Sequence, residues 1–241
     1  MQISVVIPVR NEADNVGTLM AEIHQVLSGQ EAYEMIFVND GSTDETGVNL
    51  RQAMRTYPAL RVLQHQQGCG QSRAIHTGVL AAQFSWIATL DGDGQNDPQD
   101  IPMLMAILQQ QADEDLWMLN GHRFQRRDTG WRRFSSIFAN RIRRVILHDD
   151  TPDTGCGLKL FRRDKFLNLP YFDHMHRFLP ALIRMTGGKV ISVKVSHRCR
   201  KFGYSKYGTW DRLQAGIVDL LGVIWLKKRH SLPVVSEVPR G

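Results

Sequence analysis

The sequence has few cysteines and none of the spacings at which cysteine and histidine commonly hold zinc. Its three cysteines, Cys69, Cys156 and Cys199, are odd in number and far apart, with no CxxC pair. A disulfide framework or a zinc finger is therefore not expected. Reduced thiols are typical of a reducing compartment, so we expect a cytoplasmic protein.

Long apolar runs are also lacking. A membrane-spanning helix needs ~20 consecutive apolar residues. The longest candidate, residues 217–226, has ten residues and includes Asp219. The N-terminus enters a strand-like run at residue 3, without the basic stretch and long apolar stretch of a signal peptide. We therefore expect neither a spanning helix nor a signal peptide.

The first hundred residues are poor in positive charge. They hold 5 Lys and Arg against 12 Asp and Glu, whereas residues 101–241 hold 25 against 12. A basic second half favours an anionic partner such as a phosphate group or a membrane surface, and a solvated basic face is the alternative explanation. We expect no nucleic-acid partner, because the basic half lacks interleaved aromatic residues and a known nucleic-acid-binding motif.

Apolar runs and amphipathic patterns alternate along the first hundred residues. Asp44 and Ser72 are predicted to cap the second and third helices. The alternation predicts an α/β fold with a mainly parallel central sheet and flanking helices. The predicted strands of this half are residues 3–7, 35–38, 60–63 and 86–90.

The pattern of apolar residues in the second half predicts further strands and a C-terminal amphipathic helix. We divide the chain into one α/β domain, residues 1–208, and a helix with a tail, residues 209–241. Helical patterns are predicted near residues 131–147, 174–185 and 210–229. Strands are predicted at residues 116–119, 158–161 and 190–195.

Polar motifs follow all four strands of the first half, at residues 8–12, 39–44, 68–72 and 91–95. The carboxyl ends of parallel strands meet at one edge of a sheet, where ligands of such sheets bind. Helices that begin at three of the motifs offer backbone N–H groups to anions. The sequence therefore predicts one binding site built from four loops.

The last of these motifs, Asp91-Gly92-Asp93-Gly94-Gln95, favours a metal ion. Two carboxylates this close repel unless a cation or a proton lies between them. Mg²⁺ or Mn²⁺ suits such oxygen ligands and keeps positions for phosphate oxygens. An ordinary Asp/Gly turn is the alternative, and a calcium loop is disfavoured because no Glu follows at the required spacing.

Three of these segments, residues 7–12, 38–44 and 90–95, resemble the inverting family 2 glycosyltransferases, which have the Rossmann-like GT-A fold. Within that family the chain is most similar to the branch that transfers sugars to polyprenyl phosphates. The residues that carry this second resemblance are 121–123, 126–127, 132–133, 153–159 and 197–208.

The resemblance implies a role for each matched position. Metal binding falls to Asp93 and Gln95. Catalytic roles are implied for Asp91, Asp93, Gln95, Arg200 and Lys206. Nucleotide contacts are implied for Pro8, Arg10, Glu12, Asp40, Gly70, Ser72 and Asp91. At Gly70 and Ser72 a tight turn between strand and helix explains the sequence as well as a phosphate contact does.

Four further positions concern the acceptor. Arg123, Arg127 and Arg132 are candidates for binding an acceptor phosphate, because planar guanidinium groups bind phosphate at two points. A solvated helix face is the alternative for each. Asp153 is a possible general base for a hydroxyl acceptor, and a turn before the next strand is its alternative.

The leading hypothesis is therefore an inverting, metal-dependent transferase. It would move a sugar from a UDP- or GDP-sugar to an undecaprenyl or dolichyl phosphate. We expect it to be peripheral at the cytoplasmic face of the inner membrane, where its last helix lies on the membrane surface or on an integral membrane partner. The alternatives are transfer to a saccharide or protein hydroxyl, and a non-catalytic module that binds nucleotide sugars.

Overall fold

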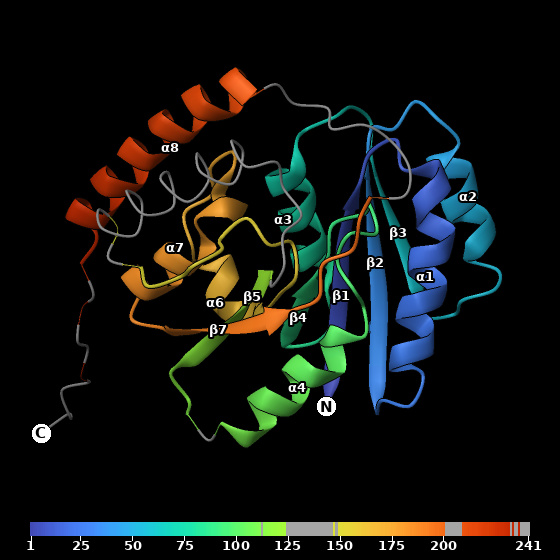
Figure 1. Cartoon of the computed structure of the whole chain (residues 1–241), viewed down its shortest axis with the longest axis horizontal. Helices are drawn as coiled ribbons and strands as arrows, with labels where there is room; N and C mark the ends of the chain where they lie inside the picture. Colours follow the sequence, from blue (N-terminus) through green and yellow to red (C-terminus); the bar gives the residue numbers. More distant parts are fainter. Residues whose placement is uncertain are drawn as a thin grey trace, which may run out of the picture.

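The computed structural model describes residues 1–111, 113–123, 147, 149–200, 209–231, 233 and 236, with the backbone alone at 209–215. A sheet of seven strands lies between helices on both faces (Figure 1). Along the chain the elements are β1 (Gln2–Val9), α1 (Ala13–Leu27), β2 (Ala32–Asp40), α2 (Thr46–Ala53), β3 (Leu60–His65), α3 (Gln71–Ala81), β4 (Trp86–Thr89), α4 (Asp100–Gln110), β5 (Leu116–Arg123), β6 (Lys159–Arg162), α6 (Arg163–Leu167), the 3₁₀ turn η1 (Met175–Arg177), α7 (Leu179–Met185), β7 (Lys189–Val195) and α8 (Thr209–Arg229).

The sheet has the strand order β3-β2-β1-β4-β6-β5-β7. Strands β1 to β4 run parallel, and β7 runs parallel to β5. Strand β6 is antiparallel to both of its neighbours, β4 and β5. The expectation of an α/β fold with a mainly parallel sheet is therefore confirmed. Strands β1, β2 and β3 end at the upper edge in Figure 1.

Alternation along β1 shows how the sheet is buried on both faces. Ile3, Val5 and Ile7 pack with residues of α1 and α4 in one apolar cluster. Val6 points to the other face and packs with residues of α3, α6 and α7. All four side chains are fully buried. Each such burial stabilises the fold by ~1.5–3 kcal/mol, so the continuous apolar runs of the sequence become central strands.

Helix boundaries differ from the sequence prediction in three places. Helix α3 begins at Gln71 with Gly70 as its cap residue, so the prediction that Ser72 caps it is wrong. The predicted helix at 174–185 is divided into the 3₁₀ turn η1 and helix α7, because Phe178 between them has a non-helical backbone (φ −112°, ψ 4°). Helix α4 is not predicted by the sequence pattern. The helix predicted near 131–147 falls largely outside the described residues.

Helix α8 is amphipathic, as the sequence predicts. Val223 is buried, and Leu220 and Ile224 pack against the apolar cluster on the α7 side of the sheet. Asp219 accepts a hydrogen bond from Nδ1 of His174 at 3.0 Å, and Lys227 donates to the backbone oxygen of Leu147 at 2.8 Å. In the described part of the chain no helix combines the length and the apolar character that crossing a membrane requires. The domain boundary between residues 208 and 209 stays a prediction.

Candidate active site

The loops after β1 and β2 are joined by Asn11. Its backbone N–H donates to the Ser42 hydroxyl at 2.9 Å, and its side-chain oxygen accepts from the Thr43 N–H at 2.8 Å. Asn11 has a left-handed backbone (φ 53°), a conformation that asparagine tolerates better than most residues. The side chain thus holds the first two polar motifs of the sequence together.

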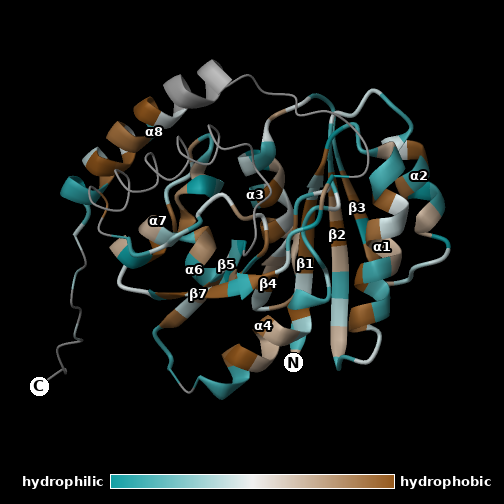
Figure 2. Ribbon diagram, in the orientation of Figure 1, coloured by the Kyte–Doolittle hydropathy of each residue, from teal (hydrophilic) through white to brown (hydrophobic). Residues whose placement is uncertain are grey.

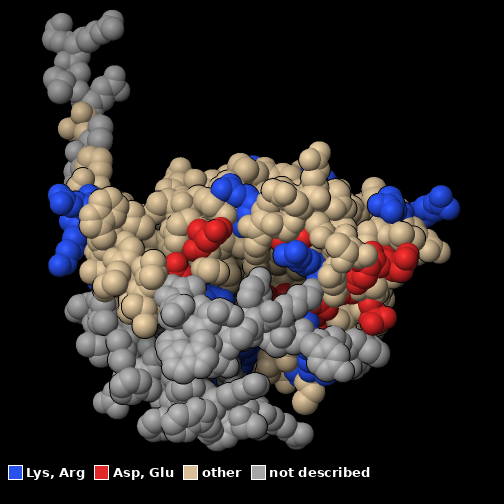
Figure 3. All heavy atoms as spheres, turned by 90° about the horizontal axis from the view of Figure 1, so that it is seen from above, with Lys and Arg blue, Asp and Glu red and all other residues tan. Residues whose placement is uncertain are grey.

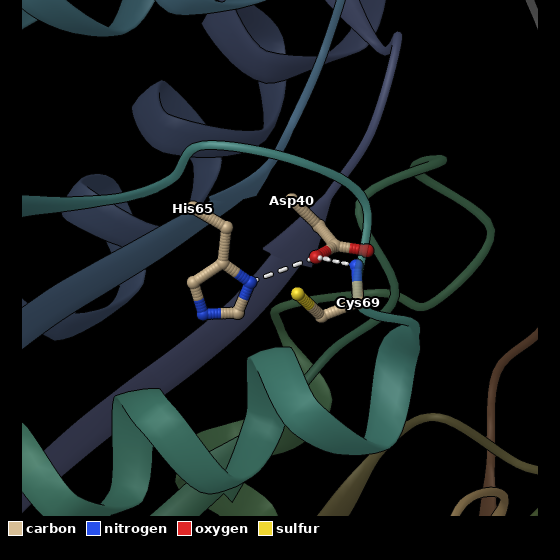
Figure 4. Close-up of side chains that lie close together, drawn as sticks. All are labelled: Asp40, His65 and Cys69. Atoms are coloured by element: carbon tan, nitrogen blue, oxygen red, sulfur yellow. Dashed lines mark hydrogen bonds and ion pairs between the residues drawn. The ribbon is translucent and has the colours of Figure 1, made fainter.

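The loops after β2 and β3 are joined by the carboxylate of Asp40 (Figure 4). It accepts hydrogen bonds from the backbone N–H groups of Cys69 (2.7 Å) and Gly70 (2.9 Å), and one from Nδ1 of His65 (2.8 Å). Burial acts to raise the pKa of this carboxyl, but the hydrogen bonds and the charge of His65 outweigh it, so the pKa lies below its usual value. Asp40 is therefore ionised at neutral pH, at the end of its strand.

The loop after β4 carries the two carboxylates of the fourth motif. Asp91 accepts a hydrogen bond from the Gln71 side chain at 2.8 Å, which ties this loop to the start of α3. The Gly157 backbone lies so close that a Cβ on this residue would come within 2.4 Å of the Asp91 carboxyl carbon. A larger residue at position 157 would therefore displace the Asp91 carboxylate. All four motifs meet at one edge of the sheet, as the sequence predicts.

Burial raises the pKa of Asp91 to about 6. The neighbouring charge of Asp93 contributes to this rise of the pKa, whereas Lys159, Arg123 and the hydrogen bond from Gln71 act to lower it. Lys159 is itself buried, and it donates to the backbone oxygens of Thr154 and Cys156. Burial lowers the pKa of Lys159 from its usual value.

The raised pKa of Asp91 predicts a dependence of stability on pH. In the unfolded chain this carboxyl loses its proton near pH ~3.9, whereas the folded protein keeps the proton up to about pH 6. Protonated Asp91 therefore contributes stability at low pH, and this contribution is lost as pH rises from about 4 to about 6. Asp91→Asn removes the titration. Denaturant unfolding of both proteins in EDTA should show the wild type losing stability relative to the variant across this range, and a constant difference would contradict the assignment.

A segment that follows β7 lies along residues 95–100, which include the end of the fourth motif. The Ser196 N–H donates to Asp100, and the Arg198 N–H donates to the backbone oxygen of Gln95. The Arg198 guanidinium also pairs with Asp97 at 2.7 Å and with Glu22 at 2.7 Å. These contacts bring residues from the basic half of the chain to the edge formed by the acidic half. Figure 3, which looks onto this edge, shows acidic and basic side chains next to each other.

Arg200 ends this described segment above the acidic pair. Its Nη2 atom lies 2.8 Å from a carboxylate oxygen of Glu12 and 4.0 Å from Oδ2 of Asp93. Glu12 also accepts a hydrogen bond from the Asn15 side chain at 2.7 Å. Glu12, which is implied for nucleotide binding, and Arg200, which is implied for catalysis, are therefore in contact although 188 positions separate them in the sequence.

The Asp91–Gln95 loop offers oxygen atoms that suit a hard divalent cation. Oδ1 of Asp93 accepts the Gln95 N–H at 3.1 Å, and the Asp93 side chain is 18% exposed. A Cβ at Gly94 would meet no atom within 4 Å, so the space next to the Gly94 backbone is open. Carboxylate and amide oxygens are ligands of Mg²⁺ and Mn²⁺. The residues present therefore fit either ion.

Arg123 and Asp153 pair with each other close to this loop. The guanidinium binds the carboxylate at two points, Nε to Oδ2 at 2.7 Å and Nη2 to Oδ1 at 2.8 Å. The side chains are only 14% and 6% exposed. The sequence predicts that Arg123 binds the phosphate of an acceptor and that Asp153 is a possible base for a hydroxyl acceptor. In the structure each holds the other, and their roles toward a substrate stay predictions.

The other positions from the sequence are placed as follows. The Arg10 guanidinium lies against Gly68, and the Pro8 backbone lies against Gly92. The Ser72 hydroxyl is buried and hydrogen bonded to Nδ1 of His176 at 2.7 Å, so it is engaged inside the protein. Arg127, Arg132 and Lys206 lie outside the described residues. Gln71, Gly157 and Arg198 also lie at the site; they fall within segments that the sequence indicates, 68–72, 153–159 and 197–208, but the sequence assigns no role to any of the three.

The fold is that of an α/β protein of the GT-A type, and the four polar motifs meet at the ends of its parallel strands. The chain belongs to glycosyl transferase family 2, whose model matches residues 4–169. It is 36% identical to the dodecaprenyl-phosphate galacturonate synthase of Rhizobium johnstonii, over 97% of this chain and 69% of that protein. It is 33% identical to the undecaprenyl-phosphate 4-deoxy-4-formamido-L-arabinose transferase of an Enterobacter species, over 98% of this chain and 72% of that protein.

Solved structures share the fold. Glucosyl-3-phosphoglycerate synthase from Mycobacterium tuberculosis, in complex with Mn²⁺, UDP and glucosyl-3-phosphoglycerate, superposes with a TM-score of 0.69 at 17% identity, over 94% of this chain and 79% of that one. A mannosyltransferase from Pyrobaculum calidifontis, in complex with GDP-mannose and Mn²⁺, superposes with a TM-score of 0.66 at 21% identity, over 95% of this chain and 65% of that one. At these identities the likeness concerns the fold alone.

Proposed function

We propose that this protein transfers a sugar from a nucleotide-diphosphate sugar to a polyprenyl phosphate, with inversion at the sugar carbon. The observation that carries the proposal is the meeting of Glu12, Asp93 and Arg200 at the strand ends, in a chain whose relatives are named as polyprenyl-phosphate transferases. The sugar, and the choice between UDP and GDP, are left to experiment.

The donor would lie along the edge formed by the four loops. The ionised Asp40 accepts hydrogen bonds, so it suits a base N–H or a ribose hydroxyl. Asp91 and Asp93 would lie at the diphosphate and the sugar, with Asp93 and Gln95 holding a divalent cation. That cation would supply positive charge to the departing diphosphate. Arg200, a fixed cation 4.0 Å from Asp93, would stabilise the same developing charge.

A polyprenyl phosphate fits the geometry at Asp153 better than a hydroxyl acceptor does. A hydroxyl needs a base to remove its proton, and Asp153 is already bound at two points by Arg123. A phosphate monoester has a second pKa near ~6, so at neutral pH it arrives as an anion and needs positioning more than deprotonation. Arg127 and Arg132 remain our candidates for positioning it.

We further propose that α8 lies on the surface of the membrane that holds the acceptor. Its outward face exposes Ile217, Val218, Leu221 and Trp225, each more than half exposed. Lys227, Lys228 and Arg229 follow in its last turn, where they suit anionic lipid. Figure 2 shows the apolar residues along this outlying helix, and Figure 3 shows basic side chains where the helix meets the tail. We infer from these features that the protein is peripheral at the cytoplasmic face of the inner membrane.

Leu221→Glu tests this attachment. Because the change removes an apolar contact and adds a charge, binding to vesicles of anionic phospholipid should weaken by roughly tenfold or more. Leu80→Glu is the matched control, since Leu80 is 53% exposed on α3. Vesicle sedimentation measures both proteins. Equal binding by the two variants would contradict attachment through α8.

The function itself is tested by a donor screen. The protein is incubated with single UDP- and GDP-sugars, undecaprenyl phosphate and Mg²⁺ or Mn²⁺, and labelled sugar is counted after extraction into organic solvent. One donor should give a metal-dependent glycolipid. A water-soluble product with an added saccharide would instead support a hydroxyl acceptor. Donor-dependent thermal stabilisation without any turnover would support a non-catalytic module.

A further inference from the structure

Asp40, His65 and Cys69 bring three different ligand atoms together at the loops after β2 and β3 (Figure 4). One oxygen of Asp40, one ring nitrogen of His65 and the sulfur of Cys69 all lie within 4.8 Å of one another. The residues come from the end of β2, the end of β3 and the turn before α3. Asp40 is buried, His65 is half-buried and Cys69 is exposed, so an ion would reach the cluster from the Cys69 side.

The chemistry of this cluster differs from that of the Asp93 loop. Thiolate sulfur and imidazole nitrogen are ligands that Zn²⁺ and similar transition metals prefer, whereas Mg²⁺ prefers oxygen. Three protein ligands are also the number found in zinc sites that keep a fourth position for water or a bound molecule. These ligand atoms therefore suit a softer ion than the hard ion that suits the oxygens at Asp93.

Neighbouring groups orient the ligands of the cluster. Nε2 of His65 lies 3.0 Å from the Thr77 hydroxyl, which either donates or accepts a hydrogen bond. When Nδ1 binds an ion, the ring proton resides on Nε2 and the Thr77 oxygen accepts it. The second carboxylate oxygen of Asp40 is held by the Gly70 N–H at 2.9 Å. Outer contacts of this kind fix the orientation of metal ligands.

We propose that Asp40, His65 and Cys69 form a second metal site, which binds Zn²⁺ or a chemically similar divalent ion together with water. Binding replaces the Asp40–His65 hydrogen bond and releases the thiol proton of Cys69. If the proposed function is correct, the ion also competes with the donor, because it occupies the carboxylate assigned to the nucleotide. Zinc would then inhibit transfer from a site apart from the catalytic metal.

Binding is tested first, without any assay of transfer. Co²⁺ is titrated into the full-length protein under a phosphine reductant, and the near-ultraviolet absorption of cobalt bound to thiolate is recorded. Wild-type protein should give this band with one equivalent of Co²⁺, and Zn²⁺ should displace it. Cys69→Ser should lose the band, and Cys199→Ser, which replaces the other exposed cysteine, should keep it. Thr77→Val should weaken binding by ~10–100-fold.

The absence of a thiolate band in the wild type, or its persistence in Cys69→Ser, would overturn the site. Competition is then measured as inhibition of glycolipid formation by buffered Zn²⁺, relative to the activity of each protein without zinc. Cys69→Ser should be less sensitive than Cys199→Ser, and equal sensitivity would overturn the competition. If the cobalt band is present but no donor reacts, the site stands and the proposed function fails.

Discussion

Asp93→Asn should lower the rate of sugar transfer by at least ~10²–10³-fold, the usual cost of removing one group that stabilises developing charge. The amide keeps an oxygen to accept the Gln95 N–H, so the loop retains its shape while the charge is lost. The reason is that, in the proposed site, Asp93 would hold the divalent cation near Arg200, at the diphosphate that leaves the sugar. Initial rates of glycolipid formation measure the effect.

Asp115→Asn is the control for the charge change, because Asp115 is a carboxylate that is 68% exposed and distant from the proposed site. EDTA should reduce the wild type to the rate of Asp93→Asn and leave that variant almost unchanged. If Asp93→Asn retains full activity, or if EDTA inhibits it as strongly as the wild type, Asp93 is not a ligand of the metal.

The second large effect concerns stability. Asp153→Ala should lower the free energy of unfolding by ~3–5 kcal/mol, because it leaves the mostly buried guanidinium of Arg123 without the carboxylate that binds it at two points. Chemical denaturation with urea measures the loss. The same variant tests the role of Asp153 as a base, because a structural role predicts that the folded fraction keeps its pH–rate profile.

Asp164→Ala is the matched control. Asp164 also binds an arginine, Arg162, at two points, but these side chains are 50% and 37% exposed. An exposed pair contributes only ~0–1 kcal/mol. The double variant Arg123→Met with Asp153→Leu should recover much of the loss, since it removes the unpaired charge. Equal losses for Asp153→Ala and Asp164→Ala would contradict a structural Arg123–Asp153 pair.

Much of the proposed donor site, at the edge formed by the four loops, is predictable from local sequence. Apolar runs of four to eight residues determine the parallel strands, and the polar residues that follow them must lie at the same edge. For this reason local pattern alone is enough to group Asp40, Asp91 and Asp93. Arg200 is indicated only by its resemblance to a family motif, because nothing in its local sequence indicates that β7 leads it to Glu12.

Other features depend on tertiary contacts that no local pattern reports. The cluster of Asp40, His65 and Cys69 is not predictable, because its ligands are separated by 25 and 4 positions, a spacing unlike that of sequence motifs for zinc. The sequence relates Ser72 to nucleotide binding, but its hydroxyl bonds to His176, 104 positions away. The Arg123–Asp153 pair likewise joins residues 30 positions apart, across β5 and the segment before β6.

A crystal structure with Mn²⁺ and a nucleoside diphosphate would test the central claim most directly. We predict Mn²⁺ at about 2 Å from an oxygen of Asp93 and bound also to the diphosphate, with the nucleoside against Asp40. Arg200 should remain within hydrogen-bonding distance of Glu12 or contact the diphosphate. A nucleotide bound away from the ends of β1, β2 and β4, or Mn²⁺ bound without Asp93, would contradict the proposed site.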